Sequence, residues 1–334
     1  MDYSEARAYI ESAAKFGSKL GFDTIKALCA RLGDPQDKLP IVHVAGTNGK
    51  GSTCAMISSI LLKAGHKPGL FLSPHLAEHR DSLFVGGEMM PETAFAETMS
   101  VLKTAADALA REGIYATEFE LLTAAAFVWF CRSGCDIAVL ETGLGGRLDA
   151  TNVVRTTRVS VITAIAMDHM QYLGDTLTQI AREKCGIIKP GGVTVTCSGQ
   201  PEEALSVIQA AAEERGNDII IPDPGQIGYT DLGLDGIMIR YREIEAHLKL
   251  PGRHQAGNAA AAIETARALR ERYGYHISDE AIRQGLEAAY LPARQEVLCR
   301  RPLVLLDGAH NLQGIEALAE TVKAHLKGRR TAVV

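Results

Sequence analysis

The segment Gly46-Thr47-Asn48-Gly49-Lys50-Gly51-Ser52-Thr53 constrains the fold of this 334-residue chain more than any other feature. It follows the apolar run Ile41–Ala45, and a helical pattern continues from it to Leu62. A strand, a glycine-rich turn and a helix in that order bring backbone N–H groups and a helix N-terminus to one point, where they can hold phosphate oxygens. The sequence therefore predicts a phosphate-binding loop at the edge of a sheet.

The side chains of this loop indicate which phosphates it holds. Lys50 would neutralise the outer phosphates of a nucleotide, and Ser52 or Thr53 could contact Mg²⁺. Gly49 and Gly51 flank the lysine and allow a close approach of the ligand. Because Gly51 separates Lys50 from Ser52, the spacing differs from that of generic kinases and GTPases, and a purely structural glycine turn is the alternative.

Three further apolar runs end at polar residues in the same way: 69–72, 137–140 and 159–163. Short apolar strands that alternate with helical patterns predict a largely parallel α/β sheet flanked by helices. Ligands of such sheets gather outside the carboxyl ends of the strands. We therefore expect Ser73, Glu141 and His169 to meet Lys50 at one rim, although each alone could be an ordinary loop residue.

The polar residues at this rim include groups that suit a metal ion. Glu141 ends a wholly apolar strand, and a carboxylate is a hard oxygen ligand that Mg²⁺ prefers. Ser73 could offer a hydroxyl to the same ion. A helix-capping or arginine-paired Glu141 and a turn-forming Ser73 are the alternatives.

Lys184 is the most informative single residue of the chain. On a helix expected over 176–188, it shares one face with Leu177, Ile180 and Ile187, so its side chain should point inward. Burial lowers a lysine's pKa and leaves a neutral amine, which CO₂ can convert into an anionic carbamate ligand. The alternative is a buried salt bridge to Glu120 or Glu183.

The second half of the chain suggests additional units. Short β-like runs between 194 and 250 predict a small antiparallel appendage rather than another βαβ unit. After a boundary near 291–294, the run 303–307 and a helix over 312–326 predict the first strand and helix of a new α/β domain, with 331–334 entering its next strand. We therefore expect domains at 1–295 and 296–334, the second truncated.

Composition limits the partners. The chain is 46% hydrophobic and 22% charged with a net charge of −5, which argues against nucleic-acid and membrane-surface partners. Its longest apolar run, 121–130, is too short to span a bilayer, and the N-terminus has no signal-peptide pattern. Seven cysteines without framework spacing suit a reducing, cytoplasmic location. No long exposed apolar strip is evident, so we expect a monomer.

Seven ordered motifs resemble the folylpolyglutamate synthase/dihydrofolate synthase family, the folate branch of the Mur ligase superfamily. They are Val44–Ser52, Ser73–Leu76, Glu141–Asn152, Asp168–Gly174, Glu183–Ile187, His254–Gln255 with Asn258–Ala260, and Asp307–Asn311. The resemblance extends from about residue 20 to residue 326. It implies a P-loop-type ATP-binding and catalytic domain followed by a Rossmann-like C-terminal domain, of which only the beginning is expected here.

The resemblance implies an ATP-dependent carboxylate–amine ligase of folate biosynthesis and one-carbon metabolism. ATP would phosphorylate a carboxylate of dihydropteroate or a reduced folate, and the amine of L-glutamate would displace phosphate to form an amide. Mg²⁺ would occupy two sites.

By the family pattern, Lys50, His169 and Lys184 would be catalytic. Gly49, Lys50, Gly51, Ser52, Asn258, Arg294, Asp307 and His310 would contact or adjoin the nucleotide. Ser73 and Glu141 would bind one Mg²⁺, and His169 with carbamylated Lys184 would bind the second. Phe119 would stack on the pterin, and Asp149 would lie on the substrate side.

Departures from the family pattern keep two alternatives open. The segment His79-Arg80-Asp81-Ser82 differs from the usual substrate loop, which leaves the preferred folate undetermined. Another Mur-type amino-acid ligase is one alternative, although the phosphate loop begins too early to leave room for a UDP-binding front domain. A non-catalytic nucleotide-binding remnant is the other, although retention of Lys50, Glu141, His169 and Lys184 argues against it. A truncated C-terminal domain would weaken ATP binding and turnover.

Overall fold

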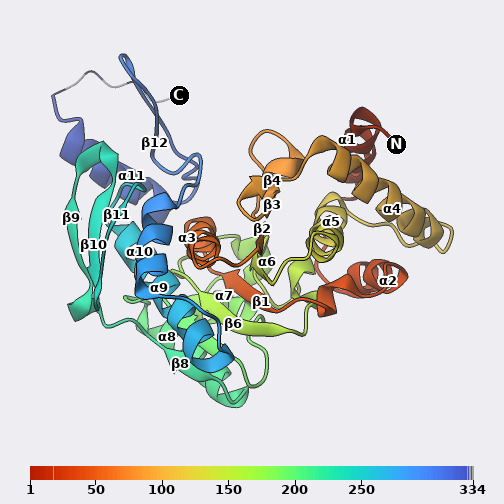
Figure 1. The fold of residues 1–334 in the computed structure, drawn as a ribbon, viewed down its shortest axis with the longest axis horizontal. Coiled ribbons are helices and arrows are strands. Elements are labelled where there is room, and N and C mark those ends of the chain that lie inside the picture. Colours follow the sequence, from red (N-terminus) through yellow and green to blue (C-terminus); the bar gives the residue numbers. More distant parts are fainter. Residues whose placement is uncertain (18, 329, 331, 333–334) are drawn as a thin grey trace.

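A computed structural model describes residues 1–17, 19–328, 330 and 332 of the chain (Figure 1). Its centre is an eight-stranded sheet with the strand order β4-β3-β2-β5-β1-β6-β7-β8. The strands are β1 (Ile41–Ala45), β2 (Pro68–Phe71), β3 (Leu83–Val85), β4 (Glu88–Met89), β5 (Ile137–Glu141), β6 (Thr157–Ile162), β7 (Val193–Thr196) and β8 (Asp218–Ile220). All neighbours pair in parallel except β2–β3 and β3–β4, which confirms the predicted α/β class.

Helices cover both faces of the sheet, so the central strands are buried on both sides. They are α1 (Tyr3–Ser12), α2 (Asp23–Arg31), α3 (Lys50–Lys63), α4 (Glu92–Ala110), α5 (Glu118–Arg132), α6 (Met170–Leu173), α7 (Leu177–Cys185), α8 (Glu202–Glu214), α9 (His254–Tyr273), α10 (Asp279–Ala288) and α11 (Leu312–His325). Every residue of β1 is buried, which explains why the strand is apolar except for His43. Val42 and Val44 join the core with α3, α9 and α10, whereas Ile41 faces the core with α1, α2, α4 and α5.

The expectation of an antiparallel appendage over 194–250 was partly wrong. β7, α8 and β8 form a further parallel βαβ unit of the central sheet. Ala204, Ile208 and Ala212 recur at four-residue spacing on α8 and bury its inner face, a helical signal that the expectation overlooked. Only β9 (Gly228–Asp231), β10 (Ile237–Tyr241) and β11 (Ile244–Leu248) form the antiparallel sheet.

The last elements are a hairpin and a helix. β12 (Glu296–Arg300) pairs antiparallel with β13 (Leu303–Leu306), so the strand expected at 303–307 has a hairpin partner instead of standing alone. α11 follows as expected. The strand expected at 331–334 falls mostly outside the described residues. No helix among the described residues combines the length and apolarity needed to cross a membrane.

Candidate active site

The loop between β1 and α3 depends on glycine at two positions. Gly49 has φ +88° and precedes the first turn of α3, which no side chain caps among the described residues. A Cβ atom on Gly49 would lie 2.4 Å from Asn258 Oδ1, and one on Gly46 would lie 1.8 Å from Thr163 Oγ1. Only glycine fits at either place. The amides at the start of α3 therefore face the cavity under a favourable helix dipole.

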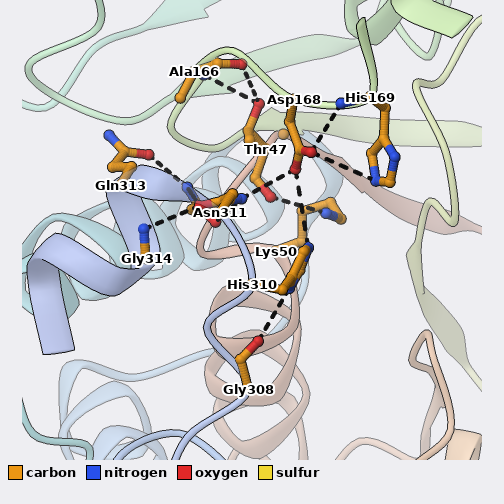
Figure 2. Close-up of polar contacts among 12 residues, drawn as sticks. Thr47, Lys50, Ala166, Asp168, His169, Gly308, His310, Asn311, Gln313 and Gly314 are labelled. Atoms are coloured by element: carbon orange, nitrogen blue, oxygen red, sulfur yellow. Dashed lines mark hydrogen bonds and ion pairs between the residues drawn. The ribbon is translucent and has the colours of Figure 1, made fainter. Parts of the chain in front are cut away.

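Thr47 ties this loop to the end of β6. Its hydroxyl donates to the Ala166 carbonyl at 3.0 Å and accepts from the Ala166 amide at 3.1 Å (Figure 2). The Lys50 amine donates to the Thr47 carbonyl at 3.2 Å, so the lysine folds back over its own loop. The strand ends at 45 and 162 are thus held together, which positions Lys50 beside Asp168 and His169.

One cavity of about 920 Å³ brings most of the predicted site together. Its lining includes Gly49, Lys50, Gly51, Ser52, Ser73, Glu141, His169, Lys184, Asn258, Arg294, Asp307 and His310. These residues come from the ends of β1, β2, β5 and β6, from α7 and α9, and from the chain around β12 and β13. The rim that the sequence predicted is therefore a real concave site.

Glu141 lies at the buried end of β5. Its side chain is enclosed, and burial raises its pKa while the nearby Lys50 charge opposes that effect. The Ser73 amide donates to Glu141 Oε2 at 3.1 Å, and the Ser73 hydroxyl donates to the Thr142 carbonyl at 3.4 Å. Among the described residues no ion pair joins Glu141 to an arginine, and its carboxylate accepts from the Ser73 amide. Carboxylate and hydroxyl oxygens thus lie together beside the phosphate loop.

Lys184 is buried with 3% of its surface exposed, as its helical spacing predicted. Its amine donates to the Gly46 carbonyl at 2.7 Å. Glu183 pairs with Arg147 and Glu120 closes the capping box of α5, so neither forms the alternative salt bridge. Burial and the neighbouring Lys50 lower the pKa of Lys184 to about 7, against the attraction of Asp168 and Asp149. A neutral amine therefore exists at physiological pH.

Asp168 connects the site to the C-terminal segment through a hydrogen bond from Asn311 (Figure 2). Asn311 donates to Asp168 Oδ2 at 3.0 Å and to Asn48 Oδ1 at 3.1 Å. Although partial burial works to raise it, the pKa of Asp168 is lowered by the Asn311 hydrogen bond and the His169 ring. One ligand atom from each of Asp168, His169 and His310 lies within 4.8 Å of the others.

Asn48, Asn311 and Gln255 are site residues whose contacts the sequence did not predict. Asn48 donates to Gln313 at 2.6 Å, and Gln255 donates to the Ser52 hydroxyl at 3.3 Å. Asn311 is also the N-cap of α11, a position that is recognisable from sequence. Its contact with Asn48, which lies 263 positions earlier in the sequence, is not recognisable, because side-chain amide pairs follow no regular spacing.

Arg294 and Asp307 also line the cavity. Asp307 accepts hydrogen bonds from the Gln295 and Ala309 amides, both at 2.8 Å. A Cβ atom on Gly308 would lie 2.6 Å from the Arg294 guanidinium, so this glycine leaves room for the arginine. The carboxylate therefore shapes the turn that presents Arg294 to the cavity.

Asp149 and Phe119 do not line the cavity. Asp149 is buried, and its carboxylate accepts from the Leu144 amide at 2.8 Å and from the Thr151 amide and hydroxyl at 2.9 and 2.5 Å. It organises the loop 143–149, and its place on the substrate side stays a prediction. Phe119 lies over Gly143, where a Cβ atom would approach its ring to 2.6 Å.

Comparison with known proteins agrees with this geometry. Residues 44–266 match the Mur ligase middle domain. The dihydrofolate synthase/folylpolyglutamate synthase of Bacillus subtilis (strain 168) is 41% identical over 340 residues, which cover 99% of this chain and 79% of that protein. The folylpolyglutamate synthase of Lacticaseibacillus casei is 35% identical, covering 97% of this chain and 77% of that protein.

Solved structures are similar over nearly the whole chain. A complex of folylpolyglutamate synthase with AMPPCP and folate superposes with a TM-score of 0.90 at 33% identity, covering 98% of this chain and 82% of the other. The E. coli FolC complex with DHPP and ADP gives a TM-score of 0.82 at 33% identity, covering 99% and 76%.

Proposed function

The chain belongs to the dihydrofolate synthase/folylpolyglutamate synthase family, and from this premise we propose that it is an ATP-dependent ligase that joins L-glutamate to the carboxylate of dihydropteroate or a reduced folate. Membership of the folate family favours this function over that of a cell-wall precursor ligase. The observation that carries the proposal is the meeting of Lys50, Glu141 and buried Lys184 at one cavity beside the phosphate loop.

The residues fit the binding of ATP. The amides that begin α3 and the Lys50 ammonium group would hold the β- and γ-phosphates, because both supply positive potential at the same point. Asn258, Arg294 and Asp307 lie along the same cavity, where they would face the nucleoside. The names of two similar structures, with AMPPCP and with ADP, support a nucleotide in this fold.

The donor set also fits two Mg²⁺ ions. Glu141 and Ser73 offer oxygen atoms on one side of the cavity, and His169 lies across from them on the same lining as Lys184. When bound, such ions neutralise charge on the transferring phosphoryl group and on the acyl centre. Burial raises the pKa of Glu141, and a bound cation would oppose that rise as the Lys50 charge does.

In the proposed reaction, a folate-type carboxylate oxygen attacks the γ-phosphorus of ATP, and ADP leaves. The glutamate amine then attacks the acyl carbon, loses a proton, and expels phosphate as the amide forms. Lys50 and the loop amides would hold the charge that builds on the phosphoryl oxygens. The walls formed by α9 and the segment 307–311 would orient the nucleotide and limit water access.

Lys184 would act as a carbamate in this proposal. Its neutral amine attacks CO₂, a C–N bond forms, and a proton is released, which leaves an anionic oxygen ligand near His169. The pKa of about 7 supports this step, because the nucleophilic form is populated without alkaline pH. Three further expectations are part of the proposal. Phe119 would stack on the pterin ring, and the domain boundary would lie between residues 295 and 296. The protein would be a cytoplasmic monomer.

ADP release tests the function directly. The purified protein, incubated with ATP, Mg²⁺ and L-glutamate, should release ADP only when dihydropteroate or a reduced folate is also present, and mass spectrometry should show the glutamylated product. Comparing dihydropteroate with reduced folates would identify the preferred substrate. Lys50→Ala should abolish release. ADP release that does not require glutamate, or that does not depend on either pteridine substrate, would disprove the proposal.

A further inference from the structure

A second cluster of ligating side chains lies outside the ATP cavity. His75 and His79 belong to the loop after β2, and Glu118 is the first residue of α5. One ligand atom from each lies within 4.8 Å of the other two. The His79 Nε2 atom is 2.9 Å from Glu118 Oε1, and the two imidazole ring centres are 4.5 Å apart. None of the three lines the ATP cavity.

His79 has an unusual environment for a histidine that merely packs. It is 5% exposed, and its Nδ1 atom is buried with no hydrogen-bond partner among the described residues. A buried polar atom without a partner costs about 1–3 kcal/mol. One ring nitrogen and one carboxylate oxygen of the cluster already lie at hydrogen-bond distance, and the third ligand atom lies within 4.8 Å of both. An ion placed among the three atoms would take the His79 nitrogen and the Glu118 oxygen as ligands together with His75.

The surrounding loop is already fixed in shape. Asp81 accepts hydrogen bonds from the amides of Leu76, Ala77 and Glu78 at 2.7–3.2 Å. Arg80 donates to Glu78 at 2.8 Å and to the Met90 carbonyl at 2.8 Å. Little conformational entropy therefore remains to be lost when a ligand joins His75 and His79.

We propose that His75, His79 and Glu118 form a site for a zinc-type divalent transition-metal ion. Two imidazoles and one carboxylate are ligands that Zn²⁺ takes, whereas Mg²⁺ prefers an all-oxygen set. Bond lengths of about 2.0–2.1 Å place the ligand atoms of a tetrahedral zinc roughly 3.3 Å apart. The three ligand atoms, now within 4.8 Å of one another, would have to move closer together when the ion binds. His75 and Glu118 are only half-buried, which gives the ion a route inward.

The bound ion would join the loop after β2 to the start of α5. Phe119 follows Glu118 directly, so the ion would fix the end of α5 that carries this ring. Three protein ligands leave a fourth coordination position for water or another small ligand. The proposal does not depend on the ligase function, since it concerns metal binding by residues outside the ATP cavity.

Co²⁺ absorption tests the site, because cobalt replaces zinc and its visible bands report tetrahedral coordination. The rival set Asp168, His169 and His310 is first disabled in the double variant His169→Asn/His310→Asn. After chelator treatment, this variant should bind one Co²⁺ with intense visible bands, and Zn²⁺ should displace it. Loss of all tight Co²⁺ binding in this background would overturn the proposal.

Single changes added to that background assign the ligands. Glu118→Gln and His75→Asn should each weaken Co²⁺ binding by about 100-fold or more, since loss of even an outer-shell partner costs 10–100-fold. His276→Asn, an exposed histidine, should leave the affinity unchanged. Circular dichroism checks folding, and His75→Asn serves if Glu118→Gln fails to fold. Unchanged Co²⁺ affinity in either folded variant refutes the assignment.

Discussion

Lys184→Met should stabilise the folded protein at neutral pH while it abolishes ligation. Lys184 is buried, and its pKa of about 7 lies far below the ordinary value of 10.5. Since one pKa unit corresponds to about 1.4 kcal/mol, keeping this group folded costs on the order of 4 kcal/mol near pH 7. Methionine has a similar length and carries no charge. The variant also loses the hydrogen bond from Lys184 to the Gly46 carbonyl, which reduces this gain in stability by about 1–2 kcal/mol.

The variant should therefore be more stable by roughly 2–3 kcal/mol at pH 7. The pH dependence of this difference identifies the buried charge as its cause. Because the folded pKa is depressed, the penalty is present in full below about pH 7 and disappears as the pH rises toward 10.5. Wild-type stability should rise relative to the variant by up to about 1.4 kcal/mol per pH unit in that window. The advantage of Lys184→Met should thus shrink steadily from pH 7 to 9.5.

Urea unfolding of both proteins in CO₂-free buffer at pH 7, 8, 9 and 9.5 measures this difference. Lys189→Met is the matched control, since its lysine is also partly buried, with a pKa of about 8, but lies outside the cavity. It should show a smaller shift of the same sign and keep its activity. A stability difference for Lys184→Met that does not change with pH would refute the reasoning. Restored turnover of Lys184→Met with short carboxylic acids would support the carbamate.

The remaining predictions concern the loop and its supports. Gly49→Ala should weaken ATP-analogue binding at least about 10-fold by calorimetry, because strain at φ +88° costs about 1–3 kcal/mol and the new Cβ meets Asn258. Gly65→Ala, with φ +85° and open space around it, should leave that affinity unchanged, and equal losses in both would contradict the reasoning. Thr151→Val should lower unfolding stability in urea by about 1–3 kcal/mol, since Asp149 and His43 both lose a buried partner; no loss would rule out that role. Asn311→Ala should raise the KM for ATP several-fold and, because Asn311 also caps α11, lower unfolding stability by about 1 kcal/mol; an unchanged KM would show that its contacts with Asn48 and Asp168 do not shape the site.

Local patterns were enough to predict most of the framework. Buried central strands read as mainly apolar runs, so β1, β5 and β6 were evident, as was the rim where they end. Helical periodicity correctly placed Lys184 inward. The prediction for 194–250 placed the antiparallel strands correctly but missed the βαβ unit, because the strands β7 and β8 are short and the turn residues between them outweighed the helical spacing of α8.

By itself, the sequence determined the parallel sheet, the phosphate loop and the residue types at its rim, because strand and helix periods and glycine conformation are local properties. Only the tertiary structure decided that Glu183 pairs with Arg147 instead of Lys184 and that Asn311 reaches Asn48. It also brought Glu118 to His79 from a separate helix. These contacts join residues that are 36 to 263 positions apart, and their partners are chosen by packing and burial, which no local pattern records.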